Sequence, residues 1–272
     1  MVTFATVLFG NNQIDYLNVL LQSIIDVYQE EASVIVYYAS VNSKSIEDIK
    51  NKAPFIFMRE DKSLDYSAKD HDCRASFKTV GWCKIIEEQR WPENLVFLDA
   101  DTLVVKKVDE YFKRADIGYT YKTHEDENLK WPINSGVVLA KNNDISLKFF
   151  KDWRDKTLEI LKSSHKKRIR LRHNWGGEDQ ASMGNILKTR DRKQYAEIIA
   201  NGNILFQGYP CEELNETRCT PITDKTHIIH YKGRWRFVIS NRKYSQWRPI
   251  EKCQGMYELW AQTLQRWNRL CG

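Results

Sequence analysis

The chain contains 272 residues, of which 42% are hydrophobic and 29% are charged, and its formal net charge is +6. This composition is typical of a packed globular protein and excludes an intrinsically disordered one. No run of about 18 apolar residues occurs, so the sequence predicts no transmembrane segment. The modest positive charge suits an anionic ligand such as a nucleotide, and it suits an ordinary solvated surface equally well.

Strands and helices alternate through the first part of the chain. Apolar strands are predicted at residues 2–10, 33–40, 54–58 and 94–98, with helices between them at 16–28, 45–50 and 77–89. The polar segment 59–73 is expected to be a mobile loop. This alternation predicts an α/β fold in which a mostly parallel sheet is flanked by helices on both faces.

The second part continues the same pattern less regularly. Strands are predicted at 117–122, 135–140, 203–209 and 226–231, and helices at 145–161 and from 181 onward. The basic run 162–173 is expected to be a solvated loop, with an anionic acceptor or a membrane surface as the alternative partner. The amphipathic segment 256–270 is expected to be a helix docked on the core rather than on a membrane.

No internal repeat and no linker rich in Pro, Gly or Ser interrupts the chain. Residues 1–272 are therefore expected to form a single compact domain, made of two halves at 1–105 and 106–272. The apolar start of the chain lacks a basic flank and is too short for a signal peptide, so it fits a first strand better.

Six cysteines show neither a CxxC pair nor a spacing typical of metal sites. They are expected to be reduced thiols in a cytoplasmic protein. Asn215, Glu216 and Thr217 form a glycosylation sequon between two of these cysteines. Without a signal peptide, this sequon is expected to be a chance occurrence.

Two aspartates follow the predicted strand 94–98, in the stretch NLVFLDADTLVV. Ligands of parallel sheets bind at the carboxyl ends of the strands, and Asp99 and Asp101 lie just beyond that end. Two carboxylates placed there can turn toward one divalent cation, and oxygen ligands suit Mn²⁺ or Mg²⁺. A pair of exposed acids in a turn is the alternative.

The stretch THIIHYKGRWR contains a second group of candidate ligands. His230 ends an apolar strand and can supply a nitrogen ligand to the same ion, or it can be a buried histidine with ordinary hydrogen bonds. The bases after it, Lys232, Arg234 and Arg236, can hold a diphosphate, while Gly233 allows a close backbone approach. A solvated strand end is the alternative for these residues.

Two further motifs contain candidate binding residues, although a purely structural role explains each motif when it is taken alone. Asn134 and Ser135 precede a strand and can hydrogen-bond a sugar, although a simple turn explains them as well. Glu178, Asp179 and Gln180 follow two glycines and open a helix, where acids also act as caps.

Taken together, LDADTLVV, INSGVVLAKN, GGEDQASM and HIIHYKGRWR resemble the GT-A fold glycosyltransferases, especially retaining family 8 and related nucleotide-diphospho-sugar transferases. The resemblance extends from the first strand to about Arg236. It implies a metal-dependent enzyme that moves a sugar from a nucleotide-diphospho-sugar, a UDP-sugar, to a glycan, protein or small-molecule acceptor with retention. A covalent intermediate would need Asp179 or Glu178 as nucleophile, whereas same-face attack would need none, and both routes stay open.

The resemblance implies that 1–105 is the nucleotide-binding half and 106–272 the donor-sugar and acceptor half, with a C-terminal helix. It also implies roles for individual residues. Asp99, Asp101 and His230 would hold Mn²⁺ or Mg²⁺, and Asp179 and Gln180 would be the catalytic pair beside the anomeric carbon. The nucleobase would lie against the loop after the first strand. The implied donor-binding residues are Leu8, Phe9, Gly10, Asn12, Lys78, Asp99, Ala100, Asp101, Asn134, Ser135, Gly233 and Arg236. At the end of the motif, Arg236 stands where the family commonly has lysine, and the Pro-Trp pair that follows this lysine in the family is absent.

Two other functions fit part of the sequence. A nucleotidyltransferase acting on sugar phosphates would use similar acids, but it usually has a glycine-rich basic loop that the stretch GNNQ lacks. A nucleic-acid-binding protein would use the positive charge and the aromatic residues. The tryptophans are scattered rather than interleaved with a basic stripe, so no nucleic-acid partner is expected.

Overall fold

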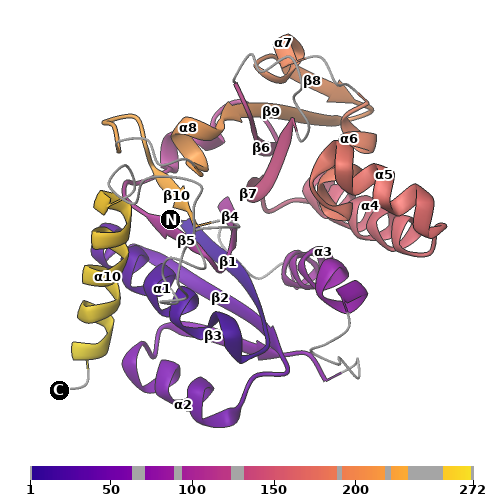
Figure 1. Cartoon of the computed structure of the whole chain (residues 1–272). Helices are drawn as coiled ribbons and strands as arrows, with labels where there is room; N and C mark the ends of the chain where they lie inside the picture. The colour runs from indigo at the N-terminus through magenta and orange to yellow at the C-terminus, as the bar shows by residue number, and fades with distance from the viewer. Residues whose placement is uncertain are drawn as a thin grey trace.

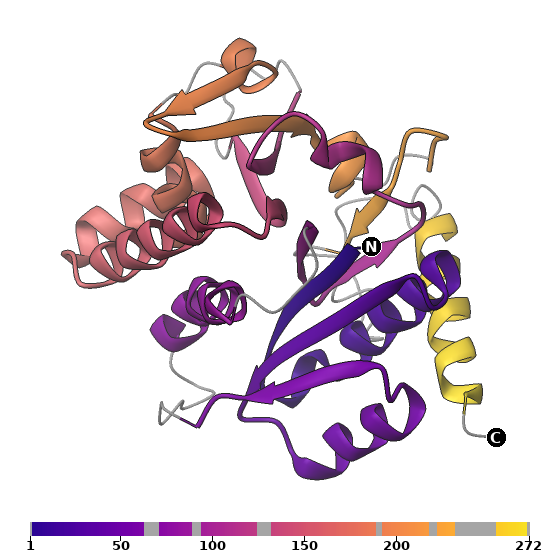
Figure 2. The ribbon, with the colours of Figure 1, turned by 180° about the vertical axis from the view of Figure 1, so that it is seen from behind.

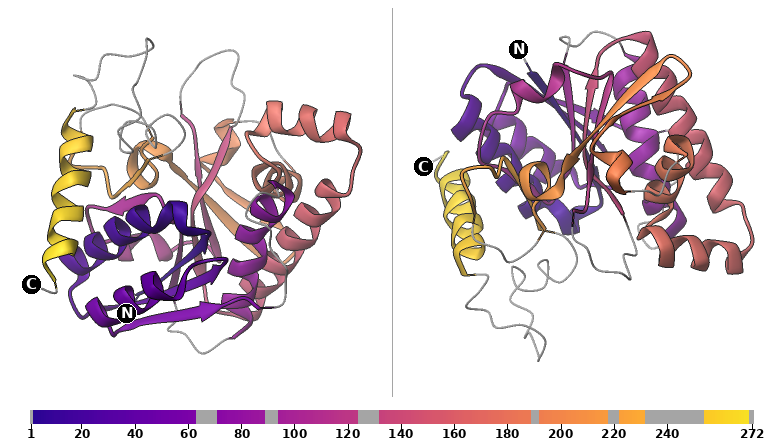
Figure 3. Two further views of the ribbon diagram at one scale, coloured as in Figure 1. Left: turned by 60° about the horizontal axis from the view of Figure 1, so that its bottom comes forward. Right: turned by 90° about the horizontal axis from the view of Figure 1, so that it is seen from above.

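The structure is a computed structural model that describes residues 2–62, 71–88, 94–123, 132–188, 192–217, 222–231 and 254–270. Its central feature is an eight-stranded sheet in the order β3-β2-β1-β4-β7-β6-β9-β8 (Figure 1). Strands β7 and β8 run against their neighbours, and the remaining neighbouring pairs are parallel. Helices lie on both sides of the strands in the right view of Figure 3, so the predicted α/β class is confirmed.

The first part of the chain builds the parallel half of the sheet. Its elements are β1 (Val2–Phe9), η1 (Asn11–Gln13), α1 (Ile14–Tyr28), β2 (Ala32–Ala39), α2 (Ser43–Lys52), β3 (Ile56–Glu60), α3 (His71–Glu87) and β4 (Asn94–Asp99). In the parallel pair of β1 with β4, Val7 lies opposite Asp99. The loop after β1 and the first aspartate therefore meet at the same edge of the sheet.

The second part adds the antiparallel strands and most of the remaining helices. Its elements are β5 (Thr102–Val104), η2 (Asp109–Phe112), β6 (Ile117–Tyr121), β7 (Ile133–Lys141), α4 (Asp144–Leu161), α5 (His165–Trp175), α6 (Glu178–Leu187), α7 (Arg192–Tyr195), β8 (Ile198–Asn201), β9 (Ile204–Pro210), α8 (Cys211–Leu214), β10 (Ile228–His230) and α10 (Gln254–Arg269). Strand β10 pairs with β5 in a separate two-stranded sheet.

Apolar side chains fill both faces of the sheet, as expected for strands covered on two sides. One face carries α1 and α2, and the other carries α3, α4 and α6. An aromatic cluster joins α3 and α4 to β4, where the ring centroids of Phe97 and Phe150 lie 4.4 Å apart and those of Trp82 and Phe97 lie 5.3 Å apart. This packing gives α3 a fixed position beside the end of β4.

Helix α10 lies alongside α1 in both Figure 1 and Figure 2. Its Met256, Trp260 and Trp267 are buried, so the predicted docking of this amphipathic helix on the core is confirmed. Within the described ranges, none of the helices is long and apolar enough to cross a bilayer.

The basic run 162–173 is not a loop, because most of it forms helix α5. Ser164 caps the helix by accepting a hydrogen bond from the backbone amide of Lys167, and Gly176 ends it with φ 86°. Two of its arginines, Arg168 and Arg172, reach Glu178 on the next helix. The helix lacks an apolar stripe because part of its inward contact is ionic, which explains why the charge pattern indicated a loop.

The predicted mobile loop 59–73 is also shorter than expected. Strand β3 extends to Glu60, and helix α3 begins at His71, so both ends of that segment are regular structure. Residues 63–70 lie outside the described residues.

Candidate metal and donor site

The two aspartates lie on the turn between β4 and β5. The hydroxyl of Thr102 donates a hydrogen bond to the backbone carbonyl of Asp99 at 2.8 Å and closes this turn. The side chain of Asp101 is 1% exposed, whereas that of Asp99 is 22% exposed. The turn therefore places one carboxylate inside the protein and the other at the rim of the site.

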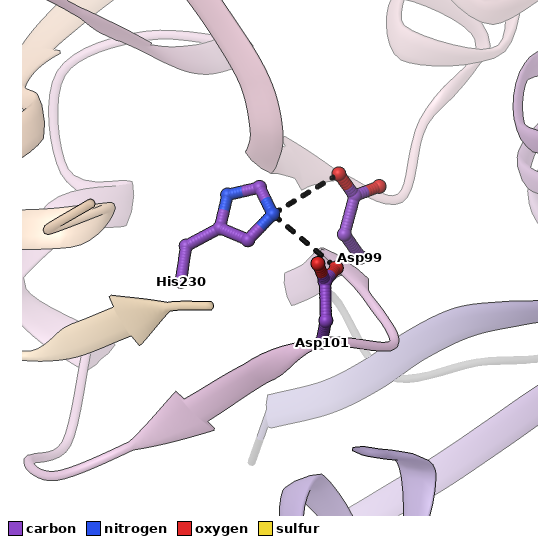
Figure 4. Close-up of side chains that lie close together, drawn as sticks. All are labelled: Asp99, Asp101 and His230. Atoms are coloured by element: carbon purple, nitrogen blue, oxygen red, sulfur yellow. Dashed lines mark ion pairs between the residues drawn. The ribbon is translucent and has the colours of Figure 1, made fainter. Parts of the chain in front are cut away.

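His230 faces both carboxylates, and Figure 4 shows the three side chains converging on one point. Its Nε2 atom lies 3.3 Å from Asp101 Oδ1 and 3.6 Å from Asp99 Oδ2. One ligand atom from each of the three residues lies within 4.8 Å of the others. The three predicted metal ligands thus come together in space.

Strand pairing brings the imidazole to this place. In the antiparallel pair of β10 with β5, His230 lies opposite Thr102. The backbone amide of Tyr231 donates to the carbonyl of Asp101 at 2.8 Å, and that of His230 donates to Glu216 at 2.9 Å. Because β10 is bonded on both sides, the position of His230 relative to Asp101 is fixed by the backbone.

Gly136 on β7 provides the space that the imidazole occupies. A Cβ atom at this position would lie 2.4 Å from both Cε1 and Nδ1 of His230, far inside van der Waals contact. The ring therefore packs directly against the backbone of β7. A glycine inside a strand often marks such a close approach, and this is the signal by which the sequence could have identified Gly136.

Lys78 on α3 lies at the centre of the more exposed half of the site. Its ammonium nitrogen is 2.8 Å from Asp99 Oδ1, 3.3 Å from Asp179 Oδ2 and 3.1 Å from Ser135 Oγ. It also lies 4.7 Å from the ring centroid of Trp82. Burial lowers the pKa of Lys78, but the charges of Asp99 and Asp179 outweigh burial and raise that pKa above its ordinary value, so the side chain is an ammonium ion.

The first turn of α6 carries three polar residues with different surroundings. Asp179 accepts a hydrogen bond of 2.5 Å from the hydroxyl of Ser135 and faces Lys78, while Gln180 is buried. Glu178 is only 3% exposed and lies 2.6 Å from Nε of Arg172. Of the two acids, Asp179 is the one directed toward the aspartates of β4.

The other predicted donor-binding residues occupy several environments. Leu8 is fully buried, whereas Phe9 is partly buried against Phe77 and Asn12 is exposed in η1. Gly10 has φ 75°, a conformation that favours glycine. The remaining positions follow: Ala100 and Asn134 are buried, and Gly233 and Arg236 lie outside the described residues.

The three converging ligands fit a divalent cation. Two carboxylates and a neutral imidazole suit Mn²⁺ well and Mg²⁺ acceptably. Nε2 of His230 is buried and forms no hydrogen bond within the part of the chain that the structure describes. Such an atom costs about 1–3 kcal/mol unless something binds it, and a cation between His230 and the two carboxylates would do so.

Two solved glycosyltransferase structures share the fold of this chain. GlyE, a glycosyltransferase of Streptococcus pneumoniae TIGR4, is 13% identical with a TM-score of 0.58 over 98% of this chain and 64% of its own. The galactosyltransferase LgtC, solved with donor and acceptor sugar analogs, is 12% identical with a TM-score of 0.53 over 98% of this chain and 96% of its own. The chain therefore spans slightly less than two thirds of GlyE. At these identities the likeness establishes the fold alone.

Sequence comparison gives the family. None of the curated proteins matches the chain significantly. A family model described as nucleotide-diphospho-sugar transferase matches residues 39–234, which is well over half of the chain and includes the turn of Asp99 and Asp101, the Asn134 strand and His230. The protein therefore belongs to the nucleotide-diphospho-sugar transferase family, and its fold is that of the GT-A glycosyltransferases.

Proposed function

We propose that the protein transfers a sugar from a UDP-sugar to an acceptor, with Mn²⁺ or Mg²⁺ bound by Asp99, Asp101 and His230. The observation that carries this proposal is the convergence of these three side chains within 4.8 Å at the carboxyl end of β4. Parallel sheets bind their ligands at that edge. Family membership supports the nucleotide-diphospho-sugar donor.

The roles of the ligands follow from their surroundings. Asp101 and His230 are buried and fixed by the β5–β10 ladder, so they would define the position of the cation. Asp99 is more exposed and would lie closer to the donor. When bound, the cation supplies Lewis-acid assistance to the departing diphosphate.

Lys78 is positioned to contact the donor. Its ammonium ion is held between two carboxylates and can donate hydrogen bonds to phosphate or sugar oxygens that approach this edge. Ser135 shares both Lys78 and Asp179 as partners, so these three side chains would orient the sugar together.

The acids of α6 differ in their suitability as catalytic groups. Asp179 shares Lys78 with the metal ligand Asp99, which supports its placement beside the anomeric carbon, next to Gln180. Glu178 is buried in an ion pair with Arg168 and Arg172, which favours a structural role. We propose retention of configuration with Asp179 as the acid involved, through either a covalent intermediate or same-face attack.

The rest of the donor would extend toward the loop after β1. We propose that Leu8, Phe9, Gly10 and Asn12 border the nucleobase, with Leu8 contributing only backbone because its side chain is buried. Ala100 and Asn134 complete the inner wall. Contacts from Gly233 and Arg236, a cytoplasmic setting and the acceptor class stay predictions.

We propose that residues 1–272 act as one catalytic domain. The main sheet continues from β1 in the first half to β9 in the second, which supports this organisation. The return of α10 to α1 supports it further.

Calorimetry with UDP, in the presence and absence of Mn²⁺, tests the proposed function. UDP is expected to bind tightly only with the metal, and Asp101→Asn is expected to remove that binding. Asp152→Asn is a matched control because it changes the same charge on the exposed surface of α4. Steeply salt-dependent DNA binding without UDP binding would instead favour the nucleic-acid reading.

Screening UDP-sugars for metal-dependent hydrolysis then identifies the donor without a known acceptor. NMR of the product's anomeric proton reports its configuration, and an inverted product would contradict retention. Release of pyrophosphate from a nucleoside triphosphate and a sugar phosphate would identify a nucleotidyltransferase instead.

A further inference from the structure

We propose that Asn215 is a positioning residue that fixes the tautomer of His230, with the proton on Nδ1, and so directs Nε2 toward a metal. The inference rests on the proposed metal role of His230. Asn215 follows α8, is fully buried, and accepts at Oδ1 from Nδ1 of His230 over a distance of 2.8 Å. It stands out in the sequence only as part of a glycosylation sequon.

The orientation of the Asn215 amide is determined by its other neighbours. Its Nδ2 lies 2.7 Å from Thr120 Oγ1 and 3.3 Å from the backbone carbonyl oxygen of Asn134. A carbonyl oxygen can only accept, so the amide nitrogen must face it. Thr120 gives its own hydroxyl proton to that same carbonyl at 2.5 Å, which leaves its oxygen free to accept from Asn215.

This orientation determines which nitrogen of His230 carries the proton. With its NH₂ group directed at Thr120 and Asn134, Asn215 presents an oxygen to Nδ1, and that oxygen can only accept. Nδ1 therefore carries hydrogen, and in the neutral ring Nε2 has a free lone pair. That lone pair faces Asp99 and Asp101, an arrangement that a cation between the three side chains would stabilise.

The neutral character of Asn215 also matters. A histidine that binds a metal usually donates a hydrogen bond from its other ring N–H to a carboxylate, a backbone carbonyl or water. A carboxylate at this position would add a third negative charge beside Asp99 and Asp101. An amide oxygen directs the proton to Nδ1 without adding negative charge to a site that already contains two buried or partly buried aspartates.

The same contacts explain why the sequon is not a modification site in the folded protein. The side chain of Asn215 is inaccessible, and both ends of its amide are already hydrogen-bonded. The asparagine thus has an internal role that the sequence pattern alone obscures.

The first test measures Mn²⁺ binding without donor, using EPR of the free ion. Asn215→Ala is expected to weaken Mn²⁺ binding about 10- to 100-fold, the usual effect of removing a partner of a metal-binding histidine. Asn201→Ala is the matched control, because the side-chain amide of Asn201 on β8 also donates a hydrogen bond to a backbone carbonyl, that of Ile186 on α6. Equal affinity in the wild type and in folded Asn215→Ala would overturn the proposal.

The second test uses the unaltered protein, so it does not depend on whether Asn215→Ala folds. In ¹⁵N-histidine-labelled protein without metal, long-range NMR correlations report the tautomer, and the His230 signals are assigned by their loss in His230→Gln. The Nδ1–H tautomer is expected. An Nε2–H tautomer or an imidazolium at pH 8 would overturn the proposal.

The two tests separate this inference from the proposed function. A wild-type protein that binds no Mn²⁺ but shows the Nδ1–H tautomer would refute the metal role and leave the positioning by Asn215 intact. If the wild type binds Mn²⁺ and Asn215→Ala binds it equally well, the positioning by Asn215 is refuted and the metal role stands.

Discussion

Asp99 and Asp101 leave the same turn, but they belong to two differently built halves of the site. The half around Asp101 is buried, and neutral hydrogen bonds and strand pairing connect it to His230 and Asn215. The half around Asp99 is partly exposed, and charges connect it to Lys78 and Asp179. Strand pairing and hydrogen bonds fix the side chains of the first half, whereas the ion pairs of the second half can exchange partners.

Under the proposed function, the buried half would hold the cation and the exposed half would receive the donor. Neutral hydrogen bonds between buried groups hold direction well, since each group has few alternative partners. An ammonium ion between two carboxylates can instead turn to a phosphate or sugar oxygen when one arrives. We therefore expect changes in the buried half to affect metal affinity, and changes in the exposed half to affect donor binding and turnover.

The most severe test of this comparison removes a charge from the buried half. Asp101→Asn is expected to abolish Mn²⁺ binding and, with it, metal-dependent binding of UDP. Because a ligand that binds only the folded state stabilises it, the wild-type Tm should rise with Mn²⁺ while that of the variant stays constant. A normal Mn²⁺-induced rise in the Tm of Asp101→Asn would contradict the assignment.

The next test separates the two neighbouring acids of α6. Asp179→Asn is expected to reduce turnover by at least about 100-fold with little change in stability, because the group is at the donor side. Glu178→Gln should instead lower the free energy of unfolding by about 1–3 kcal/mol, since it weakens a buried ionic contact with Arg172. Turnover measurements and denaturant titrations of both variants distinguish these outcomes, and the opposite pattern would exchange the roles.

A smaller effect is expected when the imidazole is displaced rather than removed. The Cβ of Gly136→Ala would overlap the ring of His230, and overpacking of this kind typically costs about 1–3 kcal/mol. Mn²⁺ affinity should fall by about 5- to 100-fold. Gly255→Ala is the control, because in the described part of the chain no atom of another segment lies within 4 Å of its added Cβ, and the change should slightly stabilise α10.

The smallest change concerns the exposed half alone. Lys78→Met keeps an unbranched side chain over Trp82 but removes the ammonium ion. UDP binding with Mn²⁺ is expected to weaken about tenfold, or 1.4 kcal/mol. Binding of Mn²⁺ without UDP should remain equal or become tighter, since Asp99 loses a competing partner. If calorimetry instead shows weaker binding of Mn²⁺ in the absence of UDP, then Lys78 contributes to metal binding, and the proposed division between the two halves is wrong.

Local patterns predicted the features of this molecule that are encoded locally. The apolar strand before Asp99 indicated a sheet edge, and alternating strands and helices indicated the α/β class that the structure confirms. The three predicted ligands do meet, although their binding of a metal stays a prediction. Each of these inferences depended on a strand and the residues directly after it.

Contacts between distant segments were not predictable in the same way. Asn215, which follows α8, and Gly136 on β7 contact His230, and Thr120 on β6 holds Asn215. Their meeting depends on the register of several strands. That register includes a bulge in the β6–β7 pair at Thr120, for which no local pattern exists. Helix α5 was missed for a related reason, because Arg172 contacts a buried acid rather than an apolar surface.

The pairing of β10 with β5 has a consequence for the order in which the site assembles during translation. The turn bearing both aspartates and the parallel strands around it are translated well before His230, so an emerging chain can assemble that half of the sheet early. His230, the third proposed ligand, arrives only when β10 reaches its place beside β5. Newly made chains should therefore have little affinity for divalent ions until late in translation, which delays any metal capture until the surrounding scaffold exists.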